Sequence, residues 1–94
     1  GASSVITVTG HLICASPADA DLVQRLLPDH IRLSRDEPGC LSFNVVQTAD
    51  PLVWQLDETF VDRTAFEAHQ ARTRASPWFT ATRHLKRAFH VSGD

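Results

Sequence analysis

Apolar and polar residues alternate in four stretches of this chain. The stretches are residues 5–14, 41–46, 53–60 and 84–91. Successive side chains of a strand point to opposite faces of a sheet, so alternation predicts strands with one buried face. The chain is therefore expected to form four strands.

Two regions between these strands carry apolar residues at helical spacing and begin with strong helix-start signals. Ser16 followed by Pro17 provides a hydroxyl N-cap and a proline in the first turn, and Asp62 begins the second helix. Ser76, also followed by a proline, restarts a short helical segment. We expect the first helix to end before Gly39, which could take the positive φ of a C-terminal cap.

The resulting order, strand-helix-strand-strand-helix-strand, is the ferredoxin-like pattern of the α+β class. Right-handed crossovers then predict one domain, residues 1–94, with an antiparallel sheet ordered 4-1-3-2 and the helices on one face. A four-residue hairpin turn would place Phe43 opposite Glu58 and put that carboxylate on the apolar face. The other face is mixed in polarity, and a second copy could cover it in a homodimer.

The net charge of −2, without a basic run, argues against a nucleic-acid surface. No apolar stretch approaches membrane-spanning length and no secretory signal is visible, so we expect a cytoplasmic protein with no membrane contact. Cys14 and Cys40 lie on strands that another strand separates, which predicts two buried free thiols. His11, His30, His84 and His90 show no metal-ligand spacing, and we expect His30 to be exposed to solvent.

The candidate chemistry is an acid and an imidazole opposed across an apolar gap. His69, on the second helix, could take a phenolic proton or hold the resulting anion, because imidazole titrates near neutral pH. Glu58, on the third strand, could orient His69 and set its tautomer. The alternative is a structural pair that fixes helix to sheet and does no chemistry.

Aromatic residues are expected to line this gap, although such a stripe is more often plain core. Trp78 and Phe79 follow the second helix, where a lid or cavity mouth is plausible. Gly10, which has no side chain, would leave space for a cavity on the helix-facing side of the first strand. Arg72, within a turn of His69, could hold an anionic substrate or be solvated, and Arg87 faces the gap if Leu85 and Phe89 do. The candidate substrate-binding residues are Phe43, Trp54, Phe60, Phe66, Arg72, Trp78 and Phe79.

Three motifs resemble the antibiotic biosynthesis monooxygenase (ABM) family of the dimeric α+β barrel superfamily. They are Glu37-Pro38-Gly39-Cys40-Leu41-x-Phe43, Leu56-x-Glu58-x-Phe60-x-Asp62, and Ala65-Phe66-x-x-His69 with Ser76-x-x-Phe79 beyond. The resemblance covers most of the chain. It implies a homodimer in which two sheets form a barrel, with a ligand cavity between sheet and helices in each subunit.

The resemblance also implies an activity. Several members oxidise phenolic or quinol-type substrates with molecular oxygen and use no flavin, haem or metal. The haem-degrading branch carries an asparagine and a tryptophan where this chain has Gly10 and His69, and the polyketide-oxidising branch differs at Leu56 and Phe60. The quinol-monooxygenase-like branch, with its Glu and His, is nearest.

The sequence therefore predicts a cofactor-independent monooxygenase acting on a small aromatic, phenolic or quinol-type substrate. In this interpretation His69 and Glu58 are catalytic, and no metal or cofactor is bound. An isomerase or tautomerase using the same pair without oxygen is one alternative, and a non-catalytic protein that binds a small ligand is another.

Overall fold

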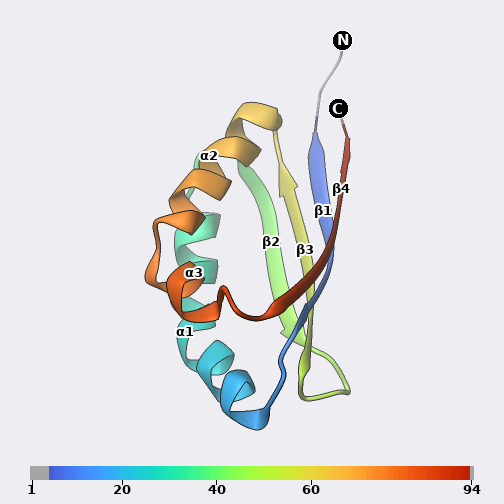
Figure 1. Cartoon of the computed structure of the whole chain (residues 1–94). Helices are drawn as coiled ribbons and strands as arrows, with labels where there is room; N and C mark the ends of the chain where they lie inside the picture. Colours follow the sequence, from blue (N-terminus) through green and yellow to red (C-terminus); the bar gives the residue numbers. More distant parts are fainter. Residues whose placement is uncertain (1–4, 94) are drawn as a thin grey trace.

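The computed structural model describes residues 5–93, which form an antiparallel four-stranded sheet with all the helices on one face (Figure 1). The strands lie in the order β2-β3-β1-β4, which is the predicted order read from the other edge. This confirms the α+β, ferredoxin-like class. The elements are β1 (Ile6–Ile13), α1 (Pro17–Arg35), β2 (Cys40–Gln47), β3 (Val53–Phe60), α2 (Arg63–Arg74), α3 (Pro77–Thr82) and β4 (Lys86–Gly93).

Each helix begins where the sequence predicted a helix start, and each start has a side-chain cap. The hydroxyl of Ser16 accepts from the backbone N–H of Asp19, and the carboxylate of Asp62 accepts from that of Ala65 at 2.8 Å. Ser76 caps α3 in the same way. These bonds satisfy N–H groups that the first turn of a helix leaves without partners.

Helix α1 ends before Gly39, as predicted, but the predicted glycine cap is wrong. The helix stops at Arg35 with Asp36 as its cap in a right-handed conformation, and Gly39 does not take a positive φ. A Cβ at Gly39 would instead overlap the Cβ of Ala65 on α2. The glycine is required because the start of β2 packs directly against that helix.

Gly10 also has a different role from the one predicted. Its φ is +150°, and a Cβ there would overlap the backbone carbonyl of Ala88 on the neighbouring strand. The expectation that Gly10 leaves room for a cavity is wrong, because the backbone of β4 occupies that space.

The β2–β3 hairpin has the predicted register. Phe43 lies opposite Glu58, Val45 opposite Leu56, and Gln47 opposite Trp54. Glu58 therefore shares the helix-facing side of the sheet with apolar neighbours and is only 6% exposed. The core that surrounds it is made of Ile6, Val8, Leu12, Cys14, Val23, Leu27, Phe43, Val45, Trp54, Leu56, Phe60, Phe66, Trp78 and Leu85.

No helix formed by residues 5–93 lies on the opposite face of the sheet (Figure 1). Val46, which alternates with the buried Val45, is 59% exposed there.

Both cysteines are free as predicted, but only Cys14 is buried and Cys40 is half-buried. None of the helices within residues 5–93 is long and apolar enough to cross a membrane.

Candidate functional site

A cavity of about 290 Å³ lies between the sheet and the helices, at the small end of the range for small-molecule sites. Its walls are mainly apolar and aromatic, with a few polar and charged side chains. The residues that line it are Val8, Leu12, Leu27, His30, Phe43, Val45, Leu56, Glu58, Phe66, His69, Gln70, Thr73, Arg74, Trp78, Phe79, Arg87, Phe89 and Val91.

His69 points from α2 into this layer and is only 5% exposed. Its Nε2 lies 3.6 Å from a carboxyl oxygen of Glu58 and 3.4 Å from the hydroxyl of Thr73. The predicted meeting of Glu58 and His69 across the gap is therefore present in the structure. The closer acid, however, is a different residue.

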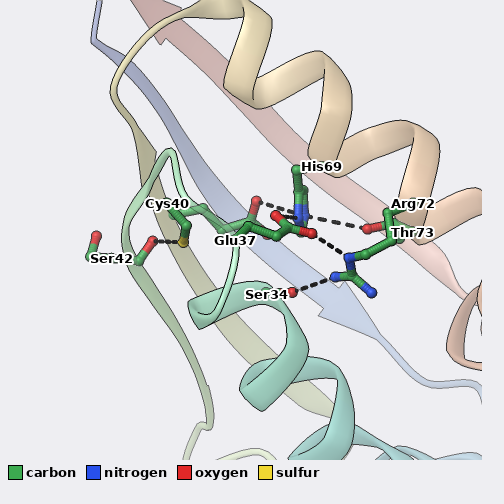
Figure 2. Close-up of polar contacts among 8 residues, drawn as sticks. Ser34, Glu37, Cys40, Ser42, His69, Arg72 and Thr73 are labelled. Atoms are coloured by element: carbon green, nitrogen blue, oxygen red, sulfur yellow. Dashed lines mark hydrogen bonds and ion pairs between the residues drawn. The ribbon is translucent and has the colours of Figure 1, made fainter.

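Glu37, in the loop between α1 and β2, lies 2.8 Å from Nδ1 of His69 (Figure 2). Its other carboxylate oxygen pairs with Nε of Arg72, whose Nη2 also donates to the hydroxyl of Ser34 at 3.0 Å. Arg72 thus holds the Glu37 carboxylate against the imidazole. A carboxylate can only accept a hydrogen bond, so this contact places the ring proton of neutral His69 on Nδ1 and leaves Nε2 as an acceptor.

Burial governs the protonation of the two groups that face the cavity. It raises the pKa of Glu58 to about 8, and the negative charge of Glu37 acts in the same direction. Burial also lowers the pKa of His69, although the hydrogen bond and charge of Glu37 oppose that shift. Near neutral pH, the 3.6 Å contact therefore joins an uncharged acid to an uncharged base.

These positions revise the predicted orienting role. The side chain that sets the tautomer of His69 is Glu37, whereas Glu58 lies on the cavity side of the ring. Sequence reasoning missed Glu37 as a site residue, although it lies in the Glu-Pro-Gly segment that carries the family resemblance. Its distance from His69, 32 positions along the chain, hides the contact in a single sequence.

His30 is buried, and the expectation that it faces solvent is wrong. Its ring stacks on Trp78 at 5.0 Å and meets Phe43 edge-on at 5.4 Å. Burial is the main cause that lowers its pKa to about 3, and the charges of Arg72, Arg87 and a protonated His69 act in the same direction, so His30 is neutral near neutral pH. The signal was available in the sequence, because His30 follows Val23 and Leu27 on one helical stripe.

Not every predicted wall residue lines the cavity. Phe43, Phe66, Trp78 and Phe79 do so, together with Glu58 and His69. Phe60 is fully buried in the core, with its ring 4.9 Å from that of His69, and Trp54 is buried outside the lining. Arg72 borders a separate hollow on the other side of His69, with Glu37. In residues 5–93, no three His, Cys, Asp or Glu side chains gather in a way that could hold a metal ion.

Comparison with known proteins agrees with this architecture. A family model described as antibiotic biosynthesis monooxygenase matches residues 6–89. The solved structure of PA3566 from Pseudomonas aeruginosa is 26% identical, with a TM-score of 0.78 over 100% of this chain and 97% of that one. Rv0793 from Mycobacterium tuberculosis is 24% identical, with a TM-score of 0.75 over 97% and 95% of the two chains. No curated protein sequence matches this chain.

The raised pKa of Glu58 predicts a loss of stability at mildly alkaline pH. Folding lifts this pKa above the ordinary value of 4.5, so the folded protein keeps a proton that the unfolded chain releases. The stabilisation is complete below pH 4.5 and is lost as the pH rises towards 8. Between pH 6.5 and 8.0 the free energy of unfolding should fall by about 1.6 kcal/mol, because the slope of about 1.4 kcal/mol per pH unit halves as the pH reaches the folded pKa.

Urea unfolding of the wild type and of Glu58→Gln at both pH values measures this loss. The variant keeps the size and polarity of the side chain but cannot ionise, so its stability should change less over this interval. The difference between the two proteins removes the contribution of the histidines. Parallel pH dependences would show that Glu58 does not titrate as described.

Proposed function

Since this chain belongs to the antibiotic biosynthesis monooxygenase family, we propose that it oxidises a small aromatic substrate of the phenol or quinol type with molecular oxygen. We propose further that the reaction needs no bound cofactor. The observation that carries the proposal is the neutral His69, with Nε2 beside a buried acid in an aromatic-lined cavity. Such a group is placed to accept a proton from a substrate hydroxyl.

The proposed reaction begins when Nε2 of His69 removes that proton. The resulting electron-rich anion reduces oxygen directly, one oxygen atom enters the ring, and the other leaves as water. A hydroquinone would give a hydroxyquinone by this route, and the substrate supplies all four electrons that oxygen accepts. The mainly apolar and aromatic walls would lower the local dielectric constant, which strengthens electrostatic interactions with the anion.

Two carboxyl groups would assist in different ways. Glu37 acts as a positioning residue, because its bond to Nδ1 keeps Nε2 free and stabilises the imidazolium once the proton has moved. Glu58 is protonated near neutral pH and can return a proton to the reduced oxygen. An acid and a base in one cavity would also suit a tautomerase, which would turn over without oxygen.

We also propose a homodimer formed through the face of the sheet that no helix of the described residues covers. The face has an exposed apolar residue in Val46, and pairing it with a second copy would add buried apolar area that a domain of this size is short of. A two-fold pairing of sheets would bury both copies of this face at once.

Sedimentation equilibrium tests the proposed dimer. The wild type should sediment at twice the chain mass of 10.4 kDa at micromolar concentration. Val46→Asp should shift the equilibrium towards monomer, because it places a charge in the interface. Leu33→Asp, at a 42% exposed position on α1, is the matched control and should leave the dimer intact. A wild-type monomer at micromolar concentration would refute the proposal.

Oxygen uptake tests the enzymatic proposal. Purified protein should consume oxygen with a hydroquinone or anthrone-type substrate, and His69→Ala should lower the rate by roughly 100-fold, the scale expected for loss of a general base. His84→Ala is the control, because His84 lies outside the cavity in an exposed pair with Asp19. Unchanged uptake in His69→Ala would remove its role, and turnover without oxygen would favour a tautomerase.

A further inference from the structure

Arg87, near the start of β4, is a cation built into the cavity wall. Its Nη1 donates to the backbone carbonyls of Thr82 at 2.8 Å and Leu85 at 3.4 Å, and its Nη2 donates to the Thr82 hydroxyl at 2.9 Å. The guanidinium also lies 5.6 Å from the centre of the Phe79 ring. These contacts hold the group in one place against the end of α3.

No carboxylate in residues 5–93 forms an ion pair with Arg87, and burial lowers the pKa of its guanidinium. A guanidinium has five N–H donors. The bonds above engage Nη1 and, once, Nη2, and no residue in 5–93 accepts a hydrogen bond from Nε, so the N–H of Nε and one N–H of Nη2 are left for a ligand. Two donors on adjacent nitrogens are the arrangement that binds a carboxylate through two hydrogen bonds.

No negative charge among the described lining residues neutralises the charge of Arg87. Glu58 is the one carboxyl group among the described lining residues, and it is uncharged near neutral pH and in contact with His69. Arg74, at the end of α2, adds a second cation to the lining. A partly desolvated cation without a counter-charge favours an anionic ligand.

The strand register separates this cation from the proton-handling pair. Glu58 lies opposite Val8 of β1, and Arg87 lies opposite Leu12 of the same strand. Four residues of strand span about 13 Å. A ligand that reaches both ends is therefore elongated, with its anion away from the reacting hydroxyl.

We propose that the cavity binds an aromatic carboxylate, whose carboxylate pairs with Nε and Nη2 of Arg87 while its ring lies against Phe79 and Trp78. The inference rests on the proposed function only in naming the substrate class of the same cavity. Binding itself requires neither oxygen nor turnover.

Calorimetric titration with 2-naphthoate and with its neutral amide, 2-naphthamide, tests this proposal. The wild type should bind the carboxylate at least about tenfold more tightly, the scale of a hydrogen bond to a charged group in a site with little water. Arg87→Gln should lose this preference, and Arg87→Lys should keep part of it, because it retains the charge but not the two adjacent donors. Arg25→Gln removes an equal charge from the exposed side of α1 and should keep the full preference.

Equal affinity of the wild type for the two probes, or an undiminished preference in a folded Arg87→Gln, would overturn the proposal. Equal affinity of the wild type for the two probes would overturn the proposal even if that variant fails to fold. His69→Ala separates this inference from the proposed function, because it should lose oxygen uptake and still prefer the carboxylate. A preference for 2-naphthoate in a protein that never consumes oxygen would support the proposed binding site and contradict the proposed oxygenase activity.

Discussion

The burial of Glu58 among apolar residues is the constraint on which the site depends. A carboxylate in such surroundings is strongly penalised, so the side chain holds its proton to a pKa of about 8. The imidazole beside it is also kept neutral, and its tautomer is set from the opposite side by Glu37. Burial therefore places an uncharged acid and an uncharged base together in one cavity near neutral pH.

The contacts form a chain that runs from the cavity towards the surface. Glu58 contacts Nε2 of His69. Glu37 contacts Nδ1, and Arg72 holds Glu37 and donates to Ser34 on α1 (Figure 2). This series of contacts connects the sheet, α2, the loop before β2, and α1. The charge of Glu37 is balanced by Arg72, so the charged pair lies at the better-solvated end of the chain. Its buried end carries no net charge.

Local patterns in the sequence were sufficient for the fold. Ser16, Asp62 and Ser76 are capping residues whose preference is encoded within a few neighbours, and the hairpin register followed from a four-residue turn. Because the register has a period of two, it also placed Glu58 on the buried face. Helical spacing then directed His69 towards the same layer.

The contacts that complete the site depend on tertiary packing. Glu37 lies in a loop without periodicity, so no local pattern reveals that it reaches His69. His30 could have been placed by its helical stripe, but its polar character favoured an exposed position. Gly10 shows the same limit: its missing Cβ is required by a close backbone neighbour on β4, which only the assembled sheet reveals.

The tautomer of His69 is the most direct measure of this account. Nitrogen-15 NMR of labelled protein near pH 7 should show a protonated Nδ1 and an unprotonated Nε2, with Glu37→Gln weakening that preference. A ring protonated at Nε2 alone, or at both nitrogens, would contradict the account, because His69 would then have no free site with which to accept a proton from a ligand in the cavity.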